Sequence, residues 1–329
     1  MGRHVAGDMP ELDRLVDEAC VGIGAEIDAL RVPLLAGVVL GGGYGRGEGG
    51  IVTRTFTLSN DLDFFAITED GAPEAKTVAN IAAALEPVSK KWTERLGVDV
   101  DFAVKTPWRL KHDESRLMVQ ELVHGYFDVA GRKGEGLFAG IERLEPSQLP
   151  IGEATRLLMN RGMGLLLAKE KAAGGAAASG RSDDFINRNI NKCVLGAGDA
   201  KLIARGEYCW KAEDRAAALG DPLYAAAVEW KFRPKAAPVC DWEKAREIWL
   251  AAEEEVSRDY RSARSSSASS QSSRTLRNAL RWLVRRRTIG DFSTFGLEPE
   301  IRVLRQISAE ISGHGGISKA LRRDWEVFN

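Results

Sequence analysis

Residues 38–67 constrain the fold of this chain more than any other stretch, because apolar residues, glycines and acids follow one another there at close spacing. An apolar run leads into a glycine-rich segment over 41–50, and the chain returns as Asn60-Asp61-Leu62-Asp63 before further apolar residues. This order predicts a strand, a glycine loop and a second strand that carries two acids. We interpret 51–59 as an inserted hairpin, because its Thr-rich and β-branched residues disfavour a helix. A dinucleotide-binding fold is therefore excluded, since a helix directly follows its glycine loop.

Acids recur on a third predicted strand. Successive side chains of a strand alternate between faces, so Asp61 and Asp63 project on the same side while the apolar residues beside them face the core. Residues 98–104 alternate in the same way and place Asp99 and Asp101 on one face. If the two strands are neighbours, three carboxylates converge over the glycine loop.

This combination of groups has a defined chemistry. Glycines let backbone N–H groups approach phosphate oxygens, because no Cβ blocks the approach and positive φ costs little. Carboxylate oxygens are ligands that Mg²⁺ prefers, and two such ions, roughly 3.5–4 Å apart, stabilise the attacking and leaving oxygens of an in-line displacement. The sequence therefore predicts transfer of a nucleotidyl group from a nucleoside triphosphate.

The order of these pieces resembles the nucleotidyltransferase superfamily typified by DNA polymerase beta and the kanamycin nucleotidyltransferases. The resemblance covers residues 35–105. Asp61 and Asp63 stand at the position of the metal-binding pair, and Asp101 stands at the third carboxylate. The loop residues that stand where the family has its Gly-Ser loop are Gly42, Gly43, Tyr44, Gly45 and Arg46. Gly43 replaces the common serine, and the gap from Gly43 to Asp61 is longer than is usual in the family.

The resemblance implies an α+β fold, with a mixed sheet flanked by helices over 1–145 and a helical domain over 146–329 that supplies the acceptor site. It implies two Mg²⁺ ions held by the three aspartates and an NTP donor, expected to be ATP. Asp101 is expected to ligate the metal that activates the acceptor hydroxyl, with Asp99 as the alternative on the same face. Arg46 is expected either to pair with phosphate or to brace the loop through Glu48.

The rest of the chain is predicted to be mainly helical. In the first half, amphipathic helices are expected over 9–31 and 74–96, a strand over 36–40, a strand or helix over 116–127, and a loop over the glycine-rich 125–140. In the second half, helices are expected over 151–173, from Ser182 to about 205, over 221–230 and 241–260, and as a pair over 298–323. The serine-rich segment 261–273 is expected to be a flexible loop or linker, followed by an arginine-rich helix over 274–287.

Charge balance suggests a contribution from the second half. A triphosphate beside three aspartates remains negative even with two Mg²⁺ ions, so cations opposite the acids would restore neutrality. Arg188 and Lys192 lie four residues apart on the predicted helix and share a face, which makes them the candidates. The alternative is that both are solvated residues on an exposed helix face.

Composition restricts the partners. The formal net charge of −1 gives no overall attraction to nucleic acid or anionic membrane, so only the 274–287 helix remains as a surface for nucleic acid, an acidic protein or lipid headgroups. The four cysteines lack C-x-x-C spacing, which favours reduced thiols over a zinc site. No apolar run approaches the ~20 residues of a membrane span. We expect a cytoplasmic enzyme whose acceptor is a small molecule or protein.

Two other functions are open at this stage. An enzyme that joins nucleotides into oligomers or cyclic products, or that extends RNA, would use the same acids and would need 274–287 as a basic channel. A toxin–antitoxin module is the second, because minimal nucleotidyltransferases pair with helical ribonucleases of the HEPN type. Those ribonucleases carry an arginine shortly before a histidine, and His314 has no arginine at that spacing. The second half is therefore not expected to be such a nuclease.

Overall fold

The computed structural model describes residues 3–71, 74–174, 180–265, 299–313 and 317–328. The chain forms two compact units. The first comprises Met1–Glu145 together with Trp210–Asp214 and Lys231–Pro234, and the second comprises the remainder. The expected division after residue 145 left out these two later segments, which the structure assigns to the first unit. The fold is mixed α+β, with a small mixed sheet and a helical C-terminal region.

A four-stranded sheet forms the centre of the first unit. Its order is β5-β4-β1-β6, in which β4 and β5 are parallel and the other neighbours are antiparallel. The strands are β1 (Leu35–Leu40), β4 (Leu62–Thr68), β5 (Val100–Lys105) and β6 (Phe127–Gly131). The predicted insertion is a separate two-stranded hairpin of β2 (Ile51–Val52) and β3 (Thr57–Leu58).

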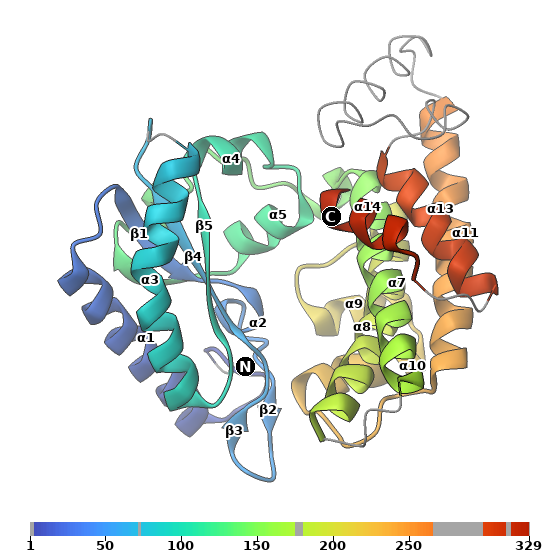
Figure 1. Cartoon of the computed structure of the whole chain (residues 1–329), viewed down its shortest axis with the longest axis horizontal. Helices are drawn as coiled ribbons and strands as arrows, with labels where there is room; N and C mark the ends of the chain where they lie inside the picture. Colours follow the sequence, from blue (N-terminus) through green and yellow to red (C-terminus); the bar gives the residue numbers. More distant parts are fainter. Residues whose placement is uncertain (1–2, 72–73, 175–179, 266–298, 314–316, 329) are drawn as a thin grey trace. The chain divides into compact units, whose positions relative to one another are not determined.

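Both faces of the sheet are covered by helices, but not equally. Leu62, Phe64 and Val100 are fully buried on the face that packs against α1 (Pro10–Leu30) and α3 (Glu74–Leu96). Figure 1 shows these two helices side by side on the sheet. The opposite face has a smaller core toward the carboxyl end of β4. Its helices are α4 (Pro107–His112), α5 (Leu117–His124) and α6 (Gly134–Leu137).

The prediction of a loop over 125–140 is wrong, because this segment contains β6 (Phe127–Gly131) and α6 (Gly134–Leu137). Its glycines are places of close approach. A Cβ at Gly131, where φ is +67°, would lie 2.6 Å from the carbonyl oxygen of Ala36, and a Cβ at Gly134 would meet the ring of Tyr126 at 2.2 Å. The undecided segment 116–127 is a helix up to His124.

The second unit is built from helices. Trp249 is buried at its centre, and its indole N–H donates to the carbonyl oxygen of Leu158 at 3.0 Å. The helices that lie wholly or partly in this unit are α7 (Ile151–Ala173), α8 (Gly180–Arg205), α9 (Ala212–Leu219), α10 (Pro222–Phe232), α11 (Trp242–Ser265), α13 (Pro299–Gly313) and α14 (Lys319–Phe328).

Three details differ from expectation. Helix α8 begins at Gly180, before Ser182, and α9 was not expected at all. Helix α11 continues to Ser265, so the first part of the serine-rich segment is helical. The rest of that segment and the expected 274–287 helix lie outside the described residues. In the described ranges, none of the helices has both the length and the apolar character needed to cross a membrane.

A glycine in α1 gives a test of the packing. A Cβ at Gly24 would lie 2.4 Å from the carbonyl oxygen of Val129 in β6, so α1 and the sheet can meet only where no side chain intervenes. Alanine normally stabilises a helix interior by about 1 kcal/mol relative to glycine. We expect Gly24→Ala to reverse this sign and to lower the free energy of unfolding by about 1–3 kcal/mol in urea denaturation, as overpacking does. Gly152→Ala is the control, since a Cβ there would meet nothing within 4 Å. Stabilisation by Gly24→Ala would contradict the packing.

Candidate active site

The glycine-rich segment is more ordered than a plain loop. Residues Gly42–Gly45 form a short helical turn, α2, directly after β1, which corrects the expectation of a helix-free loop. Gly42 has φ +60°, a conformation that glycine adopts at little cost and that lets the chain turn from strand into helix. The N–H of Gly45 donates to the oxygen of Gly41 at 2.8 Å, and the N–H of Glu48 donates to the oxygen of Gly43 at 2.8 Å. Backbone hydrogen bonds thus close the segment on itself.

This segment lies directly against the first strand of acids. The N–H of Gly41 donates to the carbonyl oxygen of Asp63 at 2.8 Å. A Cβ at Gly42 would lie 2.3 Å from Oδ2 of Asp63, so the carboxylate occupies the space that any side chain at Gly42 would need. The glycine loop and Asp63 are therefore in contact.

The acids predicted from the sequence lie on neighbouring strands. Asp63 and Asp101 are register partners in the parallel pair β4–β5, and Asp61 directly precedes β4. All three side chains are exposed, whereas Leu62 and Val100 beside them are buried on the opposite face. The period-two alternation therefore places the three carboxylates on the sheet face that α1 and α3 leave open.

Asp101 is close enough to Asp61 and Asp99 to be affected by their charges. The pKa of Asp101 is raised above its usual value, first by partial burial and then by the negative charges of Asp61 and Asp99. A nearby like charge disfavours ionisation, and a bound divalent cation would relieve that repulsion. Hard carboxylate oxygens on one face fit Mg²⁺ in donor type. In the part of the chain that the structure describes, however, no three or more His, Cys, Asp or Glu side chains are already gathered as metal ligands.

Arg46 is held by carboxylates within the first unit. Its Nε lies 3.7 Å from Oε2 of Glu48, and its Nη1 lies 3.5 Å from Oε2 of Glu121. The side chain is only 13% exposed. Of the two roles considered for Arg46, these contacts correspond to bracing of the loop.

Tyr44 also supports the loop from inside. Its side chain is buried, and its hydroxyl donates to the carbonyl oxygen of Gly50 at 2.7 Å while accepting from the N–H of Ser59 at 3.3 Å. The ring therefore links the glycine segment to the end of the inserted hairpin. Tyr44, which the sequence places in the segment expected to bind nucleotide, thus has its ring inside the protein.

The structure gives Glu48 more partners than the sequence analysis predicted. It is 1% exposed and is bound by Lys231 and by the backbone N–H of Ala212, both in segments that belong to the first unit. A charged residue inside a run of glycines was the available signal, because few acids are buried unless they are paired. Its partners lie too far along the chain to be read from local spacing.

Arg188 and Lys192 lie in the second unit. Arg188 forms an ion pair with Asp184 at 2.7 Å on the same helix, and Lys192 is exposed. Asp199, which shares their helix, instead pairs with Arg215 at 2.9 Å inside the unit. The predicted role of Arg188 and Lys192 in binding a triphosphate stays a prediction.

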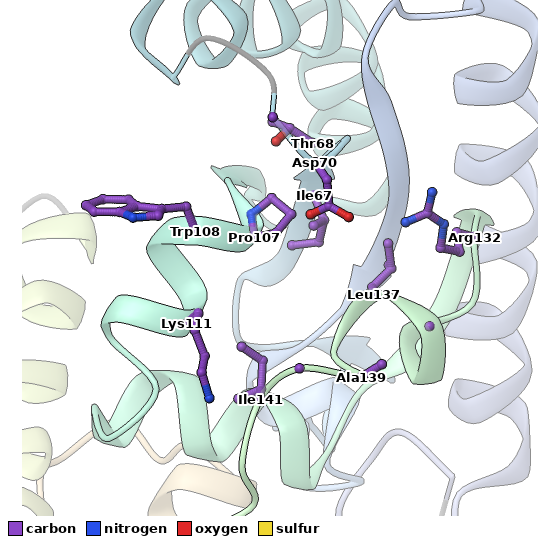
Figure 2. Close-up of a pocket in the computed structure, with 13 residues that line it drawn as sticks. Ile67, Thr68, Asp70, Pro107, Trp108, Lys111, Arg132, Leu137, Ala139 and Ile141 are labelled. Atoms are coloured by element: carbon purple, nitrogen blue, oxygen red, sulfur yellow. The ribbon is translucent and has the colours of Figure 1, made fainter.

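A sizeable pocket of the first unit, about 560 Å³, lies away from the acids, at the carboxyl end of β4 (Figure 2). Its wall includes Ile67, Pro107 and Leu137, and the ring of Trp108 points away from the other labelled side chains. Its two cations are already paired, Arg132 with Glu69 at 2.8 Å and Lys111 with Glu114 at 2.6 Å. The lining contains one acid, Asp70, and none of Asp61, Asp63 and Asp101.

Comparison with protein-family models and with curated proteins found no match to this sequence. Two contacts define the site: Gly42 of the glycine segment lies against Asp63, and the register of β4 and β5 pairs Asp63 with Asp101.

Asp61→Asn tests whether the acids lie as close as described. Removing the Asp61 charge should lower the pKa of Asp101, because one source of repulsion disappears, while partial burial and Asp99 keep it above the usual value. A carboxyl whose pKa is raised by folding stabilises the fold while protonated and loses that contribution as the pH rises through its folded pKa. The variant should therefore also be more stable than the parent at neutral pH. Carbon-13 NMR titration of Asp101 in EDTA measures the change in its pKa. If the pKa of Asp101 is the same in the variant and the parent, the two acids do not lie close together.

Proposed function

We propose that this chain is a magnesium-dependent nucleotidyltransferase. It would move a nucleoside monophosphate from an NTP, with ATP the expected donor, to a hydroxyl of a small molecule or protein. The observation that carries the proposal is the position of Asp63, which lies against Gly42 of the glycine segment and in register with Asp101. The glycine segment, which we propose binds phosphate, and carboxylates of the donor type that Mg²⁺ prefers thus meet at one end of the sheet.

Each group has a distinct task in this proposal. Asp61, Asp63 and Asp101 would hold Mg²⁺, which when bound neutralises charge on the phosphates and lowers the pKa of a coordinated hydroxyl. Asp101, with its raised pKa, would stand nearest the acceptor side, as the third carboxylate. Asp63 would also fix the metal site to the glycine segment through its contact with Gly42.

The backbone narrows which amides can bind phosphate. The N–H groups over 45–48 are used in hydrogen bonds within the segment, and the N–H of Gly49 donates to the carbonyl oxygen of His4. Among the described residues, the N–H groups of Gly42 and Gly43 make no such backbone bond, as is usual for the first amides of a helical turn. These two amides are therefore the expected phosphate donors.

The product identifies the reaction. Incubation of the full chain with Mg²⁺ and each NTP, followed by chromatography, should give no oligomeric or cyclic product without an acceptor. Transfer of labelled nucleoside monophosphate should appear on adding an acceptor from a set of hydroxyl-bearing small molecules and proteins. Product from NTP alone would favour the polymerising alternative, and no nucleotide binding at all would overturn the proposal.

Asp63→Asn is expected to reduce transfer by about 100-fold or more, because the asparagine amide cannot replace the charge that holds the metal in the transition state. Folding should be unaffected, since the side chain is exposed. Asp70→Asn, a change at an exposed acid beyond the other end of the same strand, is the control and should retain activity. Initial rates with Mg²⁺ and labelled NTP provide the measurement, and near-parental turnover in Asp63→Asn would exclude the proposed metal site.

Gly42→Ala is expected to weaken binding of a non-hydrolysable ATP analogue by about tenfold or more. The added Cβ would collide with Oδ2 of Asp63 and would disfavour φ +60°, which together displace the donor amides. Gly71→Ala is the matched control, because Gly71 has φ +72° but nothing lies within 4 Å of its Cβ position. Calorimetric titration measures both affinities. If both variants lose the same affinity, the loss in Gly42→Ala comes from backbone strain alone and not from the collision with Asp63.

A further inference from the structure

Glu48 is a buried carboxylate with partners from distant parts of the sequence. Its Oε2 lies 2.7 Å from Nζ of Lys231, and its Oε1 accepts the backbone N–H of Ala212 at 2.6 Å. Arg46 lies 3.7 Å from the same Oε2. A buried charge is costly unless it is paired and hydrogen-bonded, so removing one of these partners weakens the compensation of the Glu48 charge.

The partners belong to segments that the first unit takes from the second half of the chain, Trp210–Asp214 and Lys231–Pro234. Both segments have further attachments there. The ring of Trp210 stacks on His124 with centroids 4.1 Å apart, and a Cβ at Gly50 would lie 2.6 Å from the carbonyl oxygen of Lys231. In sequence, these segments directly flank residues 215–230 of the second unit.

Glu48 is also connected to the phosphate-binding end of the glycine segment. Its N–H donates to the carbonyl oxygen of Gly43 at 2.8 Å, and a Cβ at Gly43 would lie 3.3 Å from the carbonyl oxygen of Glu48. A displacement of Glu48 would therefore move Gly43. The conformation of the glycine segment thus depends on residues more than 160 positions later in the chain.

We propose that Glu48 and Lys231 are a positioning pair for the glycine segment. Nucleotide binding is then coupled to the attachment of Trp210–Asp214 and Lys231–Pro234 to the rest of the first unit. The proposal rests on the proposed function, since it names what holds the nucleotide-binding segment in shape. Coupling of this kind is reciprocal: the attached segments raise nucleotide affinity, and bound nucleotide strengthens the attachment. Lys231 acts through Glu48 and is not assigned a direct contact with substrate.

Hydrogen exchange of the nucleotide-free full chain tests the pair first. Glu48→Gln keeps an acceptor for the Ala212 N–H but removes the charge, and Lys231→Met removes the cation. Each should speed amide exchange over 43–50 relative to the parent. Lys244→Met and Glu247→Gln are the matched controls, because that ion pair, at 3.0 Å, is exposed on α11. Parental exchange over 43–50 in Lys231→Met would overturn the proposal.

Nucleotide binding tests the coupling. Each single variant should weaken binding of the Mg²⁺ complex of a non-hydrolysable ATP analogue by about tenfold, and the double variant should be no weaker than the worse single, because the pair acts as one unit. The KM for NTP should rise more than kcat falls, and nucleotide should slow exchange over 210–214 and 231–234 only in the parent. Losses that multiply in the double variant would overturn the pair. If the parent binds no nucleotide, the proposed function and this coupling fail together; if the parent binds and both variants bind equally well, the positioning pair alone fails.

Discussion

Burial of one face of the sheet is the constraint on which the site depends. Leu62, Phe64 and Val100 are removed from water against α1 and α3, and each such side chain is worth roughly 1.5–3 kcal/mol. A register slip of one residue would turn these side chains outward and press Asp61, Asp63 and Asp101 into an apolar core. The cost of burying unpaired carboxylates forbids that arrangement. The acids therefore share an open face because their apolar neighbours need the closed one.

The carboxylates of the first unit lie in two opposite kinds of surroundings. Asp61, Asp63 and Asp101 stay exposed and near one another, and the pKa of Asp101 is raised by burial and by its acidic neighbours. Glu48 is buried, and its charge is matched by Lys231 and approached by Arg46. The charges that act on Asp101 are negative, whereas Glu48 has cations beside it. The sign of the neighbouring charges thus distinguishes Asp101 from Glu48.

Local pattern was sufficient where each element is determined by nearby residues. The alternation over 98–104 and the apolar spacing over 9–31 predicted β5 and α1. Glycine content misled over 125–140, because Gly131 and Gly134 serve close packing against Ala36 and Tyr126 and do not mark an irregular loop. Sequence alone does not distinguish a glycine needed for turning from one needed for contact, since the difference lies in what stands opposite.

Lys231, the partner of Glu48, could not be predicted from local sequence pattern. The two residues are separated by 183 positions, and neither spacing nor composition connects them. Charge balance around a triphosphate favours cations from the second half of the chain, and a shared helical face is the only criterion that selects Arg188 and Lys192. The structure shows Arg188 paired with Asp184 on its own helix, whereas Lys231 belongs to the unit that carries the acids. Which cations approach a triphosphate therefore stays a prediction, whereas the cation beside Glu48 is determined by the fold, which places the backbone segment of Lys231 there.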